Sequence, residues 1–208
     1  MILPNGPMQD LIDGYRAFRA ERWPAERQRY LDLAKHGQKP QTLVITCSDS
    51  RSDPATIFNA SPGSMFVIRN VAAIVPPYET DSSHHGTSAA IAFAVLSLQV
   101  RNILVMGHAQ CGGVAAALDH SIADDVPFLS AWVDLLKPAV ARLPHDAHDA
   151  HTLLEQDGVR LSLERLMEFP FVAERVKAGR LELNGARFGI ADGKLELLDK
   201  ASGKFTAL

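Results

Sequence analysis

The chain has little cysteine, no excess of one charge sign and no long apolar run. Two of its 208 residues are cysteine, and its formal net charge is −3 with a pI near 6.2. Its longest apolar stretch, residues 89–98, is too short to cross a membrane. The balanced charge gives no reason to expect a nucleic-acid or anionic-membrane partner.

The amino terminus also lacks the features of a signal peptide. Residues 1–6 have neither a basic start nor a long apolar stretch. We therefore expect a cytoplasmic protein, in which thiols stay reduced. Reduced cysteines near a histidine favour metal binding or catalysis over a structural disulfide.

The remaining composition is typical of a folded globular protein. Hydrophobic residues make up 47% of the chain and charged residues 22%. This length is enough to bury a core without disulfides, so we expect one domain over residues 1–208. Within it we expect an N-terminal helical arm over residues 1–38 and an α/β core over residues 39–208.

Three short apolar runs predict the sheet of that core. Residues 43–46, 65–68 and 103–106 are typical of buried parallel strands. Residues 87–99 are long enough for a crossover helix between the second and third strands. This order predicts an α/β fold with a mainly parallel central β-sheet flanked by helices.

The two ends of the chain add further elements. Residues 9–36 predict two helical stretches with an interruption near Trp23-Pro24. Residues 181–198 predict a C-terminal hairpin turning at Ala191-Asp192-Gly193. An amphipathic helix is expected over residues 128–143, where Pro138 should kink or end it.

Both cysteines lie in segments that carry other possible metal ligands. The segments are Cys47-Ser48-Asp49-Ser50-Arg51 and His108-Ala109-Gln110-Cys111. Two thiolates and one imidazole suit zinc and leave a fourth position for water or a nearby carboxylate. Because ligands bind beyond the carboxyl ends of parallel strands, Cys47 and His108 should meet there. Two small buried cysteines and a core histidine are the alternative.

Four motifs together resemble the β-class carbonic anhydrases. They are Cys-Ser-Asp-Ser-Arg at 47–51, Arg69-Asn70, Val75-Pro76-Pro77 and Gly107-His108-x-x-Cys111-Gly112-Gly113. The likeness covers residues 38–118 and is weaker outside them. It implies one Zn²⁺ per chain, held by Cys47, His108 and Cys111, and reversible hydration of carbon dioxide to bicarbonate and a proton.

The resemblance also implies catalytic roles for Asp49 and Arg51. Asp49 would accept a hydrogen bond from the attacking water and orient it toward carbon dioxide. Arg51 can clamp that carboxylate in a fork geometry and keep it ionised. An exposed ion pair without consequence is the alternative for these two residues.

The family likeness places further residues around the substrate and between subunits. It implies substrate-binding positions at Gln38, Phe66, Val71, Phe93 and Gly112. It also implies a homodimer or a dimer of dimers, with the pocket at the dimer interface. Gln38 and Phe66 would then come from one subunit and the metal from the other.

Three positions bear on how the zinc would be regulated. Family members that bind an inhibitory bicarbonate carry a tryptophan, an arginine and a tyrosine, whereas this chain has Val44, Arg69 and Phe188. Two hydrogen-bond donors are therefore missing. We expect an open, plant-like zinc site with water as the fourth ligand, and Asp49 on the metal only in a closed state.

Two departures from the family pattern leave other functions open. Ala92 stands where a carboxylate is usual, and Ala73 stands where many relatives have asparagine. A zinc hydrolase of carbon disulfide or carbonyl sulfide and a non-catalytic, zinc-stabilised binding protein remain alternatives. A thiol redox protein is disfavoured because the cysteines are 64 positions apart.

Overall fold

The computed structural model describes residues 6–81, 83–119 and 126–208. Residues 1–5, to which most of the signal-peptide argument applies, lie outside the described residues. The chain divides into two compact units, Met1–Gln38 and Lys39–Leu208.

The first unit is helical, as the sequence predicted. It contains α1 (Pro7–Ala17), the π-helical η1 (Phe18–Arg22) and α2 (Trp23–His36). The expected interruption near Trp23-Pro24 is a widened helical turn rather than a break, since Trp23 keeps right-handed helical angles. Pro24 lies at the start of α2, where a missing N–H is tolerated.

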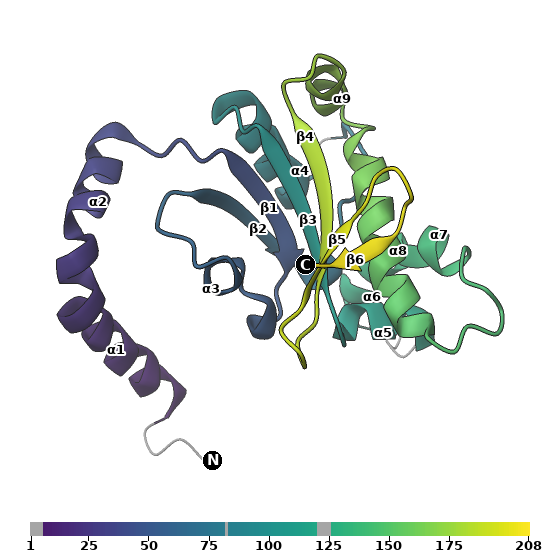
Figure 1. Ribbon diagram of the computed structural model, residues 1–208, viewed down its shortest axis with the longest axis horizontal. Coiled ribbons are helices and arrows are strands. Elements are labelled where there is room, and N and C mark those ends of the chain that lie inside the picture. Colours follow the sequence, from purple (N-terminus) through teal and green to yellow (C-terminus); the bar gives the residue numbers. More distant parts are fainter. Residues whose placement is uncertain (1–5, 82, 120–125) are drawn as a thin grey trace. The chain divides into compact units, whose positions relative to one another are not determined.

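The second unit is built on one sheet, which has six strands within the described residues (Figure 1). Its order is β2-β1-β3-β4-β5-β6, with the first four strands parallel and the last two joined antiparallel. The predicted α/β fold, its three strands and the hairpin are confirmed, whereas β6 was not predicted. The strands are β1 (Thr42–Cys47), β2 (Met65–Asn70), β3 (Asn102–His108), β4 (Glu182–Phe188), β5 (Leu195–Leu198) and β6 (Phe205–Ala207).

Helices and helical turns connect these strands. The predicted crossover helix is α4, continued by the π-helical η4, and Pro138 lies at the start of α7 instead of inside a long helix. The elements are η2 (Ser50–Ser52), α3 (Pro54–Ile57), η3 (Val71–Ala73), α4 (Gly86–Ala92), η4 (Phe93–Ser97), α5 (Gly112–Asp119), α6 (Leu129–Val133), η5 (Asp134–Leu136), α7 (Lys137–Val140), α8 (Ala150–Leu166) and α9 (Pro170–Lys177).

One face of the sheet forms the main apolar core. Alternate residues of β1 and β3 pack with Ile91 of α4, Val159 of α8 and Val172 of α9. Burying each such side chain contributes about 1.5–3 kcal/mol. Close approach of α8 to β4 requires Gly185, where an added Cβ would lie 2.9 Å from Val159. This packing fixes the carboxyl ends of β1 and β3 relative to α8.

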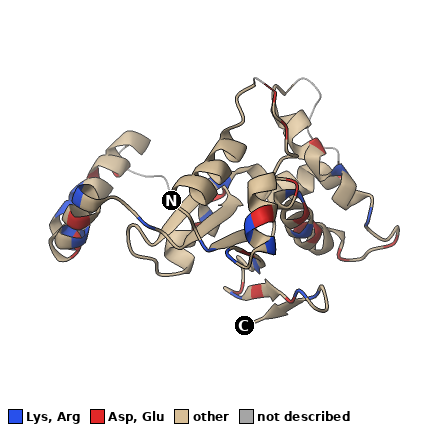
Figure 2. Ribbon diagram, turned by 90° about the horizontal axis from the view of Figure 1, so that it is seen from above, with Lys and Arg blue, Asp and Glu red and all other residues tan. Residues whose placement is uncertain are grey.

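Charged side chains of both signs are mixed along the helices rather than gathered by sign. Basic and acidic residues share α2 and α8, for example (Figure 2). None of the described helices is long and apolar enough to span a membrane.

Candidate metal centre

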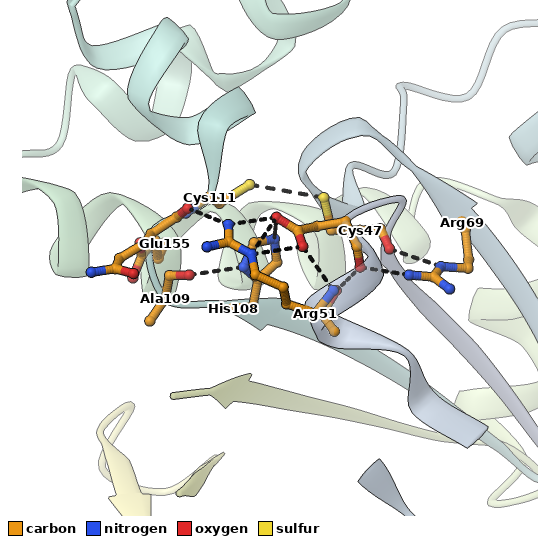
Figure 3. Close-up of polar contacts among 10 residues, drawn as sticks. Cys47, Arg51, Arg69, His108, Ala109, Cys111 and Glu155 are labelled. Carbon is orange, nitrogen blue, oxygen red and sulfur yellow. Dashed lines mark hydrogen bonds and ion pairs between the residues drawn. The ribbon is translucent and has the colours of Figure 1, made fainter. Parts of the chain in front are cut away.

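Cys47, His108 and Cys111 converge at the carboxyl end of the sheet (Figure 3). Cys47 ends β1 and His108 ends the adjacent parallel strand β3, so parallel pairing brings them together. All three residues are buried, and their ligand atoms lie within 4.8 Å of one another. The two sulfurs are 3.9 Å apart.

The histidine ring is oriented for metal binding. Its Nδ1 donates a hydrogen bond to the Ala109 carbonyl at 2.9 Å, which leaves Nε2 with a free lone pair. Nε2 is buried and has no hydrogen-bond partner among the described residues. Such an atom costs about 1–3 kcal/mol when left unsatisfied. Two thiols and this nitrogen are the donor set that zinc prefers, so the residues fit the ion.

The Cys47 thiol is prepared to lose its proton, whereas Cys111 retains its own. A hydrogen bond from Cys111 lowers the pKa of Cys47 to about 4 against the opposing effect of burial, and His108 and the backbone of Asp49 and Ala72 add to the lowering. The pKa of Cys111 is raised because Cys111 donates that bond and is itself buried. A metal ion would replace the proton that the two sulfurs share.

Asp49 and Arg51 lie beside these ligands and form a tight pair. Asp49 Oδ1 accepts from the Arg51 backbone N–H at 2.9 Å and from Nε at 3.0 Å, while Oδ2 accepts from Nη2 at 2.7 Å. These bonds hold the pKa of Asp49 well below its usual range. Oδ2 is also 4.0 Å from His108 Nε2. The carboxylate therefore stays ionised and close to the ligand set.

Arg69 fixes the loop that carries Asp49, a role that the sequence analysis missed. It donates from Nε to the Cys47 carbonyl at 3.0 Å and from Nη2 to the Asp49 carbonyl at 2.6 Å. Its Nη1 also pairs with Asp53 at 3.2 Å. The available signal was the Arg69-Asn70 motif, but its contacts depend on β2 lying next to β1.

An ion pair between buried Glu155 and partly buried Arg187 supports the ligand set at Cys111, and the sequence analysis missed it too. Glu155 of α8 accepts from Arg187 Nε at 2.8 Å and lies 3.5 Å from the Cys111 backbone N–H. Burial disfavours the charged form of Arg187, but Glu155 and Glu196 outweigh it and raise its pKa. The one sequence signal was a carboxylate among the apolar residues of α8.

Comparison with known proteins decides the family. A family model described as "Carbonic anhydrase" matches residues 42–195, which include every residue of the ligand set. The chain is also 34% identical over 198 residues to beta carbonic anhydrase 3 of Arabidopsis thaliana, covering 91% of this chain and 76% of the relative. The chain belongs to the β-class carbonic anhydrases. The predicted family, enzyme class and zinc cofactor are thereby confirmed.

Other relatives of this carbonic anhydrase agree. It is 36% identical over 207 residues to a carbonic anhydrase of Pseudomonas aeruginosa, covering 97% of this chain and 92% of the relative. The structure of the beta-carbonic anhydrase CcaA superimposes with a TM-score of 0.87 at 30% identity, covering 98% of this chain and 93% of that one. A tetrameric beta-carbonic anhydrase of Sordaria macrospora gives 0.80 at 31% identity, covering 98% and 100%.

The structure brings two predicted substrate residues of this carbonic anhydrase to the ligand set. Gly112 follows Cys111 directly, and a Cβ added at Gly113 would lie 2.6 Å from Val71, so Val71 packs beside that turn. Both therefore lie next to the predicted metal ligands.

Two further predicted substrate residues, Phe66 and Phe93, are not brought to the ligand set within one chain. Phe66 pairs with Leu43, four residues before Cys47 on β1, which is about 13 Å along a strand. Phe93 contacts Phe66 at a ring distance of 5.7 Å and is 48% exposed. Gln38 belongs to the first unit.

Proposed function

We propose that this carbonic anhydrase hydrates carbon dioxide reversibly to bicarbonate and a proton, with Cys47, His108 and Cys111 as the ligands of its zinc. One observation carries the assignment. The free Nε2 of His108 lies among two buried sulfurs and 4.0 Å from a carboxylate that Arg51 holds in place. The two sulfurs and the nitrogen can bind a divalent ion, and the carboxylate can accept a hydrogen bond from a polar reactant beside that ion.

Bound zinc would lower the pKa of a water molecule at its open coordination position. Asp49 would accept a hydrogen bond from that water and so direct a lone pair of the water oxygen at the carbon of carbon dioxide. The water oxygen would bond to that carbon as one C=O π bond opens onto its own oxygen, which gives bicarbonate, and the water proton would leave to solvent. Arg51 occupies both Asp49 oxygens, which restricts the carboxylate to one orientation.

The substrate pocket is proposed to combine two subunits. Val71 and Gly112 lie beside the ligand set, and an apolar wall suits carbon dioxide. Val67 in the middle of β2 and Phe93 and Leu96 on η4 are exposed apolar side chains. They support a homodimer or a dimer of dimers in which Gln38, Phe66 and Phe93 of a partner complete the pocket.

We also propose that the zinc is open and unregulated by bicarbonate in a cytoplasmic enzyme. Asp49 is engaged by Arg51, and Arg69 is bound to the Cys47 and Asp49 carbonyls. Val44 and Phe188 offer no side-chain donor to an anion. An inhibitory bicarbonate would therefore lack two of its hydrogen bonds.

Two measurements on the purified chain test this function. Metal content by elemental analysis should give about one zinc per chain, and stopped flow should show carbon dioxide hydration. Zinc without turnover on carbon dioxide would contradict the assignment and favour a zinc-stabilised binding protein. Turnover on carbon disulfide or carbonyl sulfide in its place would favour the hydrolase alternative.

A further inference from the structure

The loop after β2 has an unusual backbone next to the ligand set. Ala72 and Ala73 both have positive φ angles, 63° and 55°. The left-handed region costs residues other than glycine about 1–2 kcal/mol each. Two such residues in succession persist only where surrounding contacts enforce the conformation.

The strained loop makes direct contact with the metal centre. Ala72 packs against the buried cluster that contains Cys47 and Cys111, and its backbone N–H, as a donor to the Cys47 sulfur, lowers the pKa of that thiol. The loop also packs so tightly on the start of α5 that an added Cβ at Gly113 would lie 3.1 Å from Ala72 Cβ. The direction of the Ala72 N–H therefore depends on how the loop is held.

Trp132 holds the peptide group to which that N–H belongs. Its indole Nε1 donates to the Val71 carbonyl oxygen at 2.9 Å from α6, 61 positions away in the sequence. The Val71 carbonyl and the Ala72 N–H are the two ends of one planar trans peptide group, so they point in opposite directions. A donor fixed on the oxygen side consequently aims the N–H at the sulfur on the other side.

We propose that Trp132 is a positioning residue for the Cys47 thiolate and acts through the Val71–Ala72 peptide group. This rests on the proposed function, in which Cys47 is a zinc ligand. The indole bond polarises the peptide and strengthens the N–H donation to sulfur. That donation draws electron density from the thiolate and so tunes the ion that the thiolate holds.

The test uses cobalt(II) as a spectroscopic replacement for zinc. Trp132→Phe keeps an aromatic ring but removes the donor, while Trp23→Phe changes the other tryptophan, whose contacts are with Phe18, Tyr30 and Arg19. We expect the thiolate-to-cobalt charge-transfer band to move to longer wavelength in Trp132→Phe and to stay in place in Trp23→Phe. Zinc affinity should fall about tenfold in Trp132→Phe only.

A second measurement does not depend on Trp132→Phe folding. In Trp23→Phe, biosynthetic 5-fluorotryptophan changes Trp132 alone and makes its N–H a stronger donor. The cobalt band should then move to shorter wavelength. An unmoved band in both experiments, with metal bound, would overturn the positioning role. Failure of the wild-type chain to bind zinc or cobalt would overturn the proposed function as well.

Discussion

The loops that follow β1 and β2 meet at the metal centre but are held in opposite ways. Residues 48–53 are fixed by charged side chains, and Asp49 and Arg51 are 19% and 48% exposed. Residues 70–75 are fixed largely through backbone groups, and Ala73, Ile74 and Val75 are 2% exposed or less.

The partners of the second loop come from the loop itself and from α8. Asn70 caps both backbone groups of Ile74 at 2.9 Å, and Ser162 of α8 donates to the Ala73 carbonyl at 3.3 Å. Arg165, also on α8, donates to the Val75 carbonyl at 3.1 Å. Water can replace a lost bond in the exposed loop, whereas a lost bond in the buried loop leaves an unsatisfied group. The first loop thus suits a reacting group, and the second sets the position of fixed ones.

The largest expected effect is loss of the zinc ion that the proposed ligands would hold between the two loops. Cys47→Ser, His108→Ala and Cys111→Ser should each reduce zinc from about one per chain to near zero, because a three-ligand site cannot lose a strong ligand. Elemental analysis after dialysis measures this. Asp49→Asn is the control and should keep its zinc. Full zinc retention by any ligand variant would contradict that residue's assignment.

Asp49→Asn should separate chemistry from metal binding in the first loop. Turnover should fall about 100-fold or more, because a neutral amide is a much weaker hydrogen-bond acceptor for the attacking water than an ionised carboxylate. Stopped-flow assays at equal zinc content measure the loss. Asp134→Asn breaks an exposed pair with Lys137 elsewhere on the surface and should leave turnover unchanged. Equal turnover in Asp49→Asn and Asp134→Asn would show that Asp49 has no catalytic role.

Two adjacent glycines test how rigid the second loop is. Gly113→Ala should lower the free energy of unfolding by about 1–3 kcal/mol, because its Cβ would press on Val71 and Ala72. Gly112→Ala meets nothing within 4 Å and should change stability little. Urea denaturation of both variants measures the difference. Equal stabilities would show that the loop can move aside.

Relief of the strained backbone should give a smaller, opposite change. Ala73→Gly should raise the free energy of unfolding by roughly 0.5–1 kcal/mol, since glycine adopts a φ of 55° freely but loses more entropy on folding. Ala139→Gly, at a buried site in α7, is the control and should destabilise by about 1 kcal/mol. Destabilisation by both changes would contradict the strain argument.

The smallest expected effect is that of bicarbonate on the pH profile. The lowered pKa of Asp49 means that its stabilising pair with Arg51 is complete above about pH 4 and is lost only as pH falls through the lowered value. Turnover should therefore follow one smooth titration near neutral pH, with or without bicarbonate. A steep, cooperative loss sharpened by bicarbonate would overturn the open-site proposal.

The sequence alone was sufficient to predict the features that have a local periodicity or form a motif. The apolar runs at 43–46, 65–68 and 103–106 predicted the parallel strands, and the two cysteine segments predicted a shared site. Arg69, Glu155 and Trp132 were not found as supports, because their partners lie on strands or helices whose adjacency no local pattern encodes. The three-residue β6 is too short to show a strand period.

Cys47 and Cys111 are 64 positions apart, which has a consequence for the unfolded chain. An ion that joins their sulfurs closes a loop of that length. By the estimate used for covalent cross-links, closing such a loop removes about 4 kcal/mol of chain entropy from the unfolded state. Metal supply during synthesis would then influence how fast β1 finds β3 as well as how well the finished protein works.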